Sequence, residues 1–432
     1  MNLLVIGGGG REHAIIKKLR ENTDVNLIWC LPGNGGIAAD ADCVSIGAKE
    51  IDGIYEFARA HDVDFAIVAQ DDPLALGCVD RLHSLGIPCF GPDAKAAQIE
   101  ASKVFAKNLM KRYGIPTADY QVFENADDAL SYLESASFPI VLKADGLALG
   151  KGVLIASSLD EAKEAVSEIM QEKRFGDSGN RMVIEEFLTG PEVSVLAFTD
   201  GKTVSPMVSS MDHKRAGDGD TGLNTGGMGT IAPNPYYTEE IAESCMNEIF
   251  LPTIRAMAAE GCPFKGCLYF GLMLTPDGPK VIEYNCRFGD PETQVVLPLL
   301  KTDLLTIMQA VEEERLSELK IEWSSGAAAC VILASGGYPL AYEKGKEIRI
   351  PDELPQNVTV FHAGDKRVNG KLVTSGGRVL GVTATAGSLQ EALHDAYDAA
   401  AQIHFDNMMF RHDIGQRALR VLEDGNDFSR IR

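Results

Sequence analysis

The chain has 432 residues, which is too long for one hydrophobic core and suggests about three domains. Its formal net charge of −22 disfavours general binding to nucleic acid, because no excess of basic residues is available to neutralise phosphates. The mean hydropathy of −0.03, with no apolar run of about 18 residues, predicts a cytoplasmic protein without a membrane segment. Nine cysteines without a Cys-x-x-Cys pair support neither a zinc site nor a disulfide framework.

Apolar strands and helical stretches alternate through the N-terminal part of the chain. A glycine turn at 7–10 follows the first strand and opens a helix at 11–19. The strands that we expect are at 3–6, 27–30, 64–68 and 87–90. Strands separated by helices are typical of a parallel sheet. We therefore predict an α/β domain at residues 1–101.

A central domain is expected at residues 102–325. It begins with a helix at 94–113 that carries Lys103 and Lys107. Six short elements follow, which are strands at 120–123, 140–144, 153–156 and 182–186 and helices at 126–135 and 159–172. We predict that they form a compact α+β module, a mobile lid at about 117–188.

The rest of the central domain contains strands and one unusual loop. Its further elements are strands at 193–199, 204–209, 266–274 and 280–285 and a helix at 303–313. A polar, glycine-rich stretch at 212–229 is too long for a tight turn and too rich in special residues to be a simple linker. Strands at 358–363, 371–375 and 378–384 and a helix at 388–403 then predict a small C-terminal domain at 326–432.

A strand is expected to end at Asn285, in the run that points most strongly to chemistry. Side chains alternate across a strand, so Glu283 and Asn285 should project from one face and Ile282 and Tyr284 from the other. Magnesium takes a few protein oxygens and completes its shell with water and phosphates, so this pair followed by Arg287 favours a nucleotide-phosphate site. A strand end with a polar cap is the simpler interpretation.

The glycine turn at 7–10 lies where backbone N–H groups and a helix dipole attract a phosphate. A dinucleotide fingerprint requires glycine at its sixth position, which is Glu12 here. We therefore favour a simple phosphorylated ligand over a dinucleotide. The alternative is a plain turn with Arg11 and His13 in solvent.

Three further segments are candidates for ligand contact. Lys143 and Lys151 lie in a glycine-rich turn at 143–153, which can cover triphosphate oxygens although it is not a Walker A loop; an ordinary hairpin would look the same. The segment 185–192 could pair with an adenine edge and with ribose, or be a solvated hinge. The segment 212–229 combines charges with a backbone that a ligand can approach closely, although His213 alone could be a structural histidine.

These segments, in this order, resemble the ATP-grasp superfamily and, more narrowly, the phosphoribosylamine–glycine ligase family, over essentially the whole chain. The matching motifs are at 9–14, 32–34, 90–92, 143–148, 212–215, 224–229 and 283–294. The motifs at 224–229 and 285–294 are the most specific. The resemblance implies an N-terminal parallel-sheet domain, an ATP-grasp fold with a mobile lid, and a small C-terminal α+β domain.

The resemblance also implies a reaction, the ATP-dependent ligation of glycine to 5-phosphoribosylamine in purine biosynthesis. Glycine carboxylate would attack the γ-phosphate to give glycyl phosphate, and the ribosylamine nitrogen would then displace phosphate. Mg²⁺ or Mn²⁺ would accompany ATP. No nucleic acid or membrane partner is expected, and a monomer is favoured over an obligate oligomer.

The family motifs imply roles for individual residues. On the nucleotide side, the implied ATP contacts are Lys103, Lys143, Lys151, Glu185, Phe187, Leu188 and Glu192, and the metal ligands are Glu283 and Asn285. The implied catalytic residues are Arg287, Lys214 and Asp212. The implied substrate contacts are Gly9, Gly10, Arg11, His13, Asn224, Thr225, Gly226 and Gly227.

The chain departs from the family pattern at several positions. Gly8 replaces a frequent asparagine and Asp71 a frequent glutamate, which puts contacts there in doubt. Leu149 and Leu223 replace a frequent alanine and proline. Leu272 and Met273 occupy a region where many ATP-grasp proteins carry an acidic ligand, so no third protein carboxylate is identified for the metal.

Other functions are compatible with parts of the pattern. Another ATP-grasp ligase or carboxylase would share the ATP and metal residues but differ in acceptor, and the stretch at 212–229 argues for the glycine ligase. A nicotinamide-dependent oxidoreductase is disfavoured by the missing third glycine. A nucleotide sensor without turnover would not need Lys143, Glu283 and Arg287 together.

Overall fold

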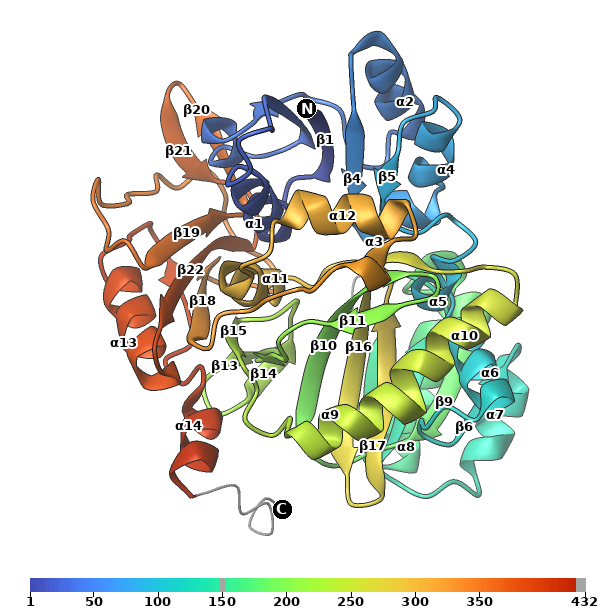
Figure 1. The fold of residues 1–432 in the computed structure, drawn as a ribbon. Coiled ribbons are helices and arrows are strands. Elements are labelled where there is room, and N and C mark those ends of the chain that lie inside the picture. The colour runs from blue at the N-terminus through green and yellow to red at the C-terminus, as the bar shows by residue number, and fades with distance from the viewer. Residues whose placement is uncertain (148–151, 425–432) are drawn as a thin grey trace.

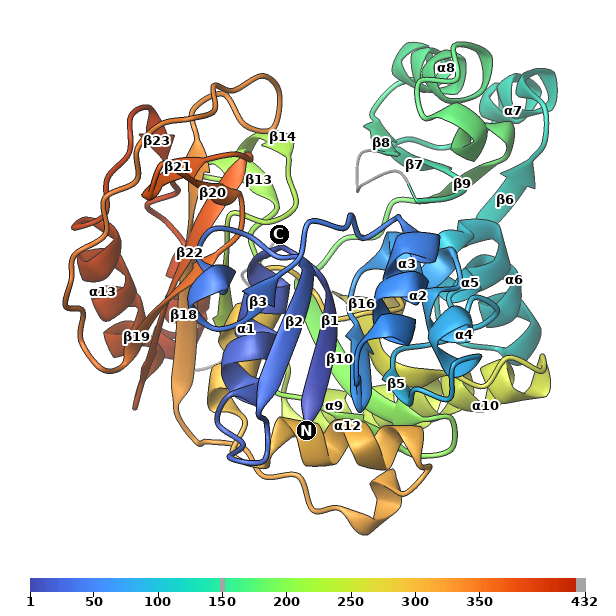
Figure 2. The same cartoon turned by 90° about the horizontal axis from the view of Figure 1, so that it is seen from above.

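The computed structural model describes residues 1–147 and 152–424. Lys151, expected to cover ATP phosphates, lies outside the described residues. Figure 1 shows the N-terminal part (blue) above the central sheet and the C-terminal part (orange and red) beside both. In Figure 2 the lid projects from the rest, on the side away from the C-terminal part. No helix among the described residues is long and apolar enough to cross a membrane.

The N-terminal sheet has five parallel strands in the order β3-β2-β1-β4-β5, which confirms the expected α/β unit. Its elements are β1 (Asn2–Gly7), α1 (Gly10–Leu19), β2 (Leu27–Pro32), β3 (Asp42–Cys43), α2 (Ile51–Ala60), β4 (Phe65–Val68), α3 (Asp71–Ala75), α4 (Cys78–His83) and β5 (Cys89–Phe90). The chain leaves β1 first toward β2 and later toward β4. Ligands bind beside the carboxyl end of the strand at such a switch point, which here is the glycine turn.

The helix predicted at 94–113 is two helices, α5 (Gln98–Ala101) and α6 (Lys103–Tyr113). The prediction of one helix was wrong because Ser102 has an extended backbone, with φ −131° and ψ 110°. Its hydroxyl accepts a hydrogen bond from the N–H of Phe105 at 3.1 Å and so caps a new helix. The break leaves the first amides of α6 facing the lid.

The lid has its own sheet and its own hydrophobic core. Its elements are β6 (Tyr120–Phe123), α7 (Ala126–Leu133), β7 (Ile140–Ala144), β8 (Val153–Ala156), α8 (Leu159–Val166) and β9 (Met182–Glu186), with the strand order β6-β9-β7-β8. A π-helical turn, Ser167–Gln171, extends α8. The apolar side chains packed in this core all come from residues 123–184. The lid thus has a sheet and a core of its own and does not extend the central sheet.

The central sheet is antiparallel, with the order β11-β10-β16-β17. Its strands are β10 (Glu192–Asp200), β11 (Val204–Pro206), β16 (Lys265–Thr275) and β17 (Gly278–Asn285). The expected pairing of the last two strands is confirmed, but a bulge leaves Ile282 unpaired. Val281 and Tyr284 therefore join the main core, while Ile282 packs with Leu188 and Met273 in another cluster. The prediction that Ile282 and Tyr284 share a face was wrong for this reason.

One face of the central sheet is covered by a helical run that the sequence analysis did not assign (Figure 1). It consists of α9 (Glu239–Cys245), a π-helical segment (Met246–Phe250) and α10 (Leu251–Ala259). Phe250 packs on Phe270 of β16 with ring centroids 4.3 Å apart. Two more helices follow β17, α11 (Thr293–Val296) and α12 (Leu304–Glu312).

The C-terminal sheet takes two strands from the middle of the chain. Its order is β12-β15-β18-β22-β19, where β12 is Met211–Asp212 and β15 is Gly229–Ala232. The others are β18 (Ala327–Ser335), β19 (Val358–His362), β22 (Arg378–Ala386) and β23 (Met408–Met409), with helices α13 (Leu389–Ala400) and α14 (Gln416–Glu423). Two hairpins project, β13 (Arg215–Gly217) with β14 (Thr221–Asn224) and β20 (Asp365–Val368) with β21 (Lys371–Thr374). The glycine-rich stretch is therefore anchored at both ends to the C-terminal sheet.

Candidate active site

A cavity of about 790 Å³ lies where the lid, the central sheet and the two outer parts of the chain meet. Each part contributes charged side chains to its wall. The charged residues from these parts include Arg11, Asp71, Lys103, Lys143, Lys214, Glu283, Arg287, Arg378 and Arg417. The cavity is thus built from residues more than 400 positions apart in the sequence.

Two lysines define one end of the cavity. The Nζ of Lys103 donates to the carbonyl of Gly146 at 2.8 Å, and the Nζ of Lys143 donates to the carbonyl of Ile282 at 3.1 Å. Burial, together with the charge of Lys143, lowers the pKa of Lys103. A polyanion placed here would relieve the repulsion between the two ammonium groups, so this end suits the phosphates of a nucleotide.

Glu185 is not free to meet a ligand with its carboxylate. It is buried and pairs with both Lys143 and Lys107. Burial alone would raise the pKa of Glu185, but the two ammonium groups outweigh it and lower that pKa. The glutamate thus fixes Lys143 at this end of the cavity.

An apolar slot lies beside the segment that leaves the lid. Ala118, Leu188 and Met273 form a small buried cluster against Ile282, and all four line the cavity. Within residues 1–147 and 152–424, the N–H groups of Phe187 and Leu188 bond to no other backbone group. A slot with apolar walls and free amides at its edge suits a planar base.

The end of β17 carries two side chains with oxygen atoms suited to a cation, the carboxylate of Glu283 and the carboxamide of Asn285, and the carboxylate is ionised. The Nζ of Lys214 lies 3.4 Å from Glu283 and 3.5 Å from Glu192. Lys214 lowers the pKa of Glu283 to about 2, against the opposing effect of burial, so the carboxylate is charged at neutral pH. Asn285 lies beside it, and its Oδ1 accepts from Arg287 at 3.0 Å.

These residues fit a divalent cation that is shared with a nucleotide. In the described part of the chain, no three His, Cys, Asp or Glu side chains are grouped to hold a metal ion. An all-protein cage is therefore not built here. One carboxylate and one carboxamide suit Mg²⁺ or Mn²⁺ when phosphates and water supply the other ligands.

Arg287 is held in place by Glu100, which the sequence analysis missed. The Nη2 of Arg287 lies 3.0 Å from Glu100, and the same carboxylate accepts from the N–H of Cys286 at 2.7 Å. The Nε of Arg287 is buried and bonds to no atom of the described residues. The Nη1 donates one N–H to the carbonyl of Phe288 at 3.3 Å, which leaves its other N–H, besides the Nε–H, without a bond to the described residues.

Asp71, noted above as a departure, also faces the cavity. Burial alone would raise the pKa of Asp71, but Arg287 and Arg11 outweigh it and lower that pKa. The shorter side chain therefore keeps its charge next to two arginines.

Asp212, which is half-buried, and Glu292, which is buried, are two acidic groups that influence each other in the cavity wall. Burial and the charge of Glu292 raise the pKa of Asp212 well above its ordinary value, and burial raises the pKa of Glu292. Asp212 accepts from the N–H of His213 at 2.7 Å, and Glu292 accepts from the hydroxyl of Ser194 at 3.4 Å. Both line the cavity. A cationic ligand group between them would restore their charge. Glu292 lies in the motif at 283–294, so the sequence contained a signal for a role of this residue in the site.

The glycine-rich stretch brings several expected substrate residues to the cavity. Asn224, Thr225 and Gly226 line it, whereas Gly227 packs behind it. Gly227 has φ +119°, and a side chain there would meet Pro291 and Asp212 at about 2.5 Å. Only glycine therefore allows this close approach.

The N-terminal turn is only partly exposed to the cavity. Gly9 and Arg11 line it. The N–H of Gly9 already donates to Glu12 at 2.7 Å, and that of Arg11 to Asp290 at 3.3 Å. A phosphate at this helix start would have to displace a carboxylate. Gly10 faces Gln294 instead.

His13 points away from the cavity, toward the C-terminal part of the chain. Its Nε2 lies 2.9 Å from Asp40, and its Nδ1 accepts from the N–H of His362 at 2.8 Å. Both ring nitrogens are thus used in joining the outer parts.

The C-terminal part supplies cavity residues that the sequence did not indicate. The Nη1 of Arg378 donates to the carbonyls of Gly226 and Asp290 at 2.8 and 2.7 Å. Arg417, on α14, also lines the cavity. Their roles depend on tertiary packing, and nothing in their local sequence marks them.

An antiparallel sheet ending in acidic and amide ligands, under a separate lid with basic residues, defines the ATP-grasp class of enzymes. The comparisons with known families narrow this class. The N domain of phosphoribosylglycinamide synthetase matches residues 1–100, its ATP-grasp (A) domain residues 101–293 and its C domain residues 328–417. The chain belongs to the phosphoribosylglycinamide synthetase family.

Individual relatives agree with this placement. The chain is 47% identical over 423 residues to a phosphoribosylamine–glycine ligase of Vibrio vulnificus, covering 97% of this chain and 99% of that protein. The crystal structure of the Thermotoga maritima phosphoribosylamine–glycine ligase has a TM-score of 0.85 at 35% identity, covering 96% of this chain and 100% of that one. The biotin carboxylase domain of the Hydrogenobacter thermophilus 2-oxoglutarate carboxylase, solved with MgADP, has a TM-score of 0.72 at 15% identity, covering 100% and 96%. At this identity, the biotin carboxylase domain and the present chain are shown to share a fold and nothing further.

We predict that His13 makes stability depend on pH. Burial lowers its folded pKa from 6.5 to about 4, so the unfolded chain binds a proton at a higher pH than the folded chain does. The free energy of unfolding should therefore fall as the pH drops from 6.5 to 4. His13→Gln should reduce this slope by up to about 1.4 kcal/mol per pH unit. Chemical unfolding at several pH values measures the slope.

The matched control is His394→Gln, because that side chain is 72% exposed. It should leave the slope unchanged. An equal slope in the wild type and in His13→Gln would contradict the role of His13.

Proposed function

We propose that this cavity carries out the reaction of the family. The protein is an ATP-dependent carbon–nitrogen ligase, which joins glycine to 5-phosphoribosylamine to give glycinamide ribonucleotide, ADP and phosphate in purine biosynthesis. The observation that carries the proposal is the convergence of Lys103, Lys143, Glu283 and Arg287 on one cavity. These are the groups that a phosphoryl transfer to a carboxylate needs.

ATP binds between the lid and the central sheet. Adenine occupies the slot formed by Leu188, Met273 and Ile282, with the free amides of the segment 187–188 at its edge. Lys103 and Lys143 neutralise the phosphates, and Glu192 meets the ribose. The family resemblance assigns the cover of the phosphates to Lys151, which lies outside the described residues.

Glu283 and Asn285 would hold Mg²⁺ or Mn²⁺ beside the ATP phosphates. When bound, the cation neutralises phosphate charge and so makes the γ-phosphorus a better electrophile. Lys214 is the group that balances Glu283 in the cation's absence.

Glycine binds with its ammonium group between Asp212 and Glu292. The acidic pair then regains its charge, and the glycine carboxylate is directed toward the ATP phosphates. An oxygen of that carboxylate attacks the γ-phosphorus, ADP leaves, and glycyl phosphate forms. The guanidinium of Arg287 and the ammonium of Lys214 stabilise the charge on the acyl phosphate.

The ribosylamine nitrogen then attacks the glycyl carbonyl carbon, phosphate leaves, and the new amide nitrogen loses a proton. The amine substrate lies against Asn224, Thr225 and Gly226. Its phosphate is met by the N-terminal turn, where Gly9 and Arg11 line the cavity. The other residues assigned to this substrate, Gly10, His13 and Gly227, support the same walls from behind.

The division of labour follows the proposed domains. Residues 1–101 and 326–432 flank the amine substrate, and residues 102–325, with the lid at about 117–188, hold ATP and glycine and add the stretch at 224–226 to the amine site. All nine cysteines are unpaired thiols, which suits a reducing cytoplasm. We propose that the protein works as a monomer.

The first test is ADP release with ATP, Mg²⁺ and glycine, with and without freshly generated 5-phosphoribosylamine. Sustained ADP release should require both glycine and the ribosylamine, because only the complete reaction regenerates the free enzyme. ADP release that neither compound stimulates, in a preparation that binds ATP, would contradict the proposed acceptor.

Glu292→Gln should weaken glycine binding specifically. The amide removes one of the two charges around the ammonium, so we expect the KM for glycine to rise by about tenfold or more. The KM for ATP should change by less than about twofold, because Glu292 lies apart from the adenine slot. Initial rates at varied glycine and ATP measure both constants.

Glu313→Gln is the control, because that residue is exposed on the surface. Equal increases in both KM values for Glu292→Gln would indicate a general disturbance of the site and would contradict the assigned role.

A further inference from the structure

Above its base, where Ala118 and Leu188 pack on Met273 and Ile282, the lid contacts the body of the protein through polar groups. Its apolar core is complete within residues 123–184 and does not continue into the central sheet. The contacts across the boundary include the bonds of Lys103 to Gly146 and of Lys143 to Ile282. A polar boundary of this kind can separate and reform more easily than a shared hydrophobic core.

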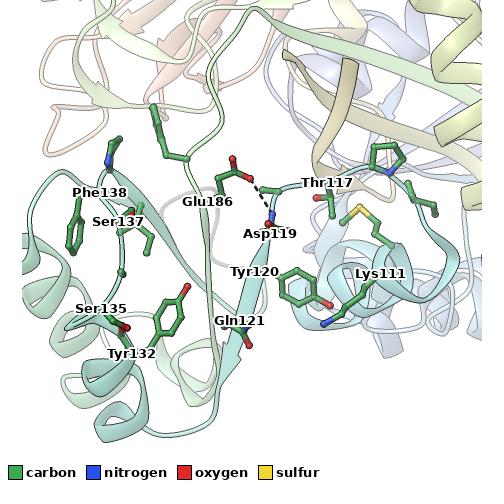
Figure 3. Close-up of a pocket in the computed structure, with 18 of the residues that line it drawn as sticks. Lys111, Thr117, Asp119, Tyr120, Gln121, Tyr132, Ser135, Ser137, Phe138 and Glu186 are labelled. Carbon is green, nitrogen blue, oxygen red and sulfur yellow. Dashed lines mark hydrogen bonds between the residues drawn. The ribbon is translucent and has the colours of Figure 1, made fainter. Parts of the chain in front are cut away.

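On one side, the lid is joined to the body by two chain crossings. Glu186 donates its N–H to the carbonyl of Asp119 at 2.9 Å, and the N–H of Asp119 donates back to the Glu186 carboxylate at 3.4 Å. These bonds, one of which is drawn in Figure 3, hold the two crossings together, and we treat the pair as a hinge about which the lid can turn. They fix where the lid turns but not how far it turns.

A second cavity, of about 950 Å³, lies beside this hinge. Figure 3 shows Lys111, on α6, and Tyr132, in the lid, on opposite sides of it. At the edge of this space the hydroxyl of Tyr120 donates to Asn108 on α6 at 2.9 Å, so polar contacts, rather than a shared apolar core, join the lid to α6 here. Two further contacts join the lid to α6 away from this cavity: the buried ion pair between Lys107 and Glu185, and a carboxylate on the other side of the lid.

On that other side, a lid carboxylate reaches the start of α6. Asp145 is buried, and its Oδ1 accepts from the N–H of Val104 at 3.2 Å and from the hydroxyl of Ser102 at 3.1 Å. Within the lid, Arg181 lies 2.6 Å from the same carboxylate and orients it. Val104 is the second residue of α6, so Asp145 supplies a helix cap from a distant part of the chain.

The cap lies directly beside the phosphate end of the active-site cavity. Lys103 lies between Ser102 and Val104, and it donates to the carbonyl of Gly146, the residue after Asp145. Lys143, two residues before Asp145, donates to Ile282 on β17. Docking Asp145 on α6 therefore places both phosphate-binding lysines at the same time.

We propose that Asp145 is a positioning residue that latches the lid to α6 and thereby sets the ATP affinity of the cavity. The carboxylate does not touch the reacting atoms. It favours the lid position in which Lys103 and Lys143 face one ligand, and without it this position is less populated. The inference rests on the proposed function for the identity of the ligand, ATP, but the latch itself is independent of turnover.

The test compares Asp145→Ala with Asp145→Asn. Loss of the cap should weaken ATP binding, measured by calorimetry, by about tenfold, since the affinity falls with the fraction of competent protein. The kcat at saturating ATP should stay within about twofold, because bound ATP restores the lid position. Asp145→Asn keeps an acceptor oxygen but loses its charge, so it should weaken binding by only about threefold.

Hydrogen exchange gives a readout that needs no activity. In Asp145→Ala the segment 102–106 should exchange about tenfold faster, because the N–H of Val104 loses its acceptor. The lid strand at 182–186 should exchange as in the wild type. Asp160→Ala, at an exposed position on α8, is the matched control and should match the wild type in both measurements.

Unchanged ATP affinity in Asp145→Ala, or a lower kcat with unchanged affinity, would overturn the proposal. If Asp145→Ala exchanges rapidly throughout the lid, the variant is misfolded and Asp145→Asn decides, with wild-type affinity counting against the latch. ATP binding and exchange are measured without glycine or ribosylamine. A wild type that binds ATP but forms no product would therefore contradict the proposed function and leave the test of the latch valid.

Discussion

Lys214 lies among the carboxylates of Glu192 and Glu283 at the centre of the cavity, and the rest of the site depends on this arrangement. The lysine keeps Glu283 ionised in a partly buried position, where an unpaired carboxylate would be costly. It reaches this place because the glycine-rich stretch is anchored by β12 and β15 to the C-terminal sheet. The C-terminal sheet thus holds Lys214 in the position where it keeps Glu283, at the end of β17, charged.

The same principle, one group holding the charge of another, recurs around the cavity. Glu185 fixes Lys143, and Glu100 fixes Arg287. Asp212 and Glu292 are the exception, because burial outweighs the nearby cations and raises the pKa of both carboxyl groups. Balanced groups are ready in position before ligands bind, while the unbalanced pair marks where a substrate must bring the missing charge. This contrast separates the scaffold of the site from its recognition points.

Local sequence patterns were enough for the strands of the lid and for the parallel N-terminal sheet, because short apolar runs between turn residues specify both. They did not reveal the break at Ser102, since its neighbours continue a helical pattern and the cap from Asp145 comes from a distant segment. The helical run from α9 to α10 was also missed. Thr238 followed by two glutamates is a visible start signal, but Pro252 interrupts the pattern.

Residues that line the cavity were predictable where one short motif carries several of them, as at 283–294. The convergence of Glu283, Asn285 and Arg287 follows from their closeness at and just beyond the end of β17, while their roles and those of the ATP lysines stay predictions from the family resemblance. Arg378 and Glu100 could not be found in this way, because they act through contacts with distant segments. The bulge at Ile282 was hidden too, because it arises from register with β16 and not from the sequence of β17 itself.

The most direct measurement is a crystal structure with Mn²⁺ and a non-hydrolysable ATP analogue, with anomalous data collected at the manganese edge. We expect an anomalous peak in contact with the carboxylate of Glu283, the carboxamide oxygen of Asn285 and the analogue's phosphates. Lys214 should then be displaced from Glu283. A peak held by other side chains, with Glu283 still paired to Lys214 and the nucleotide elsewhere, would contradict this expectation.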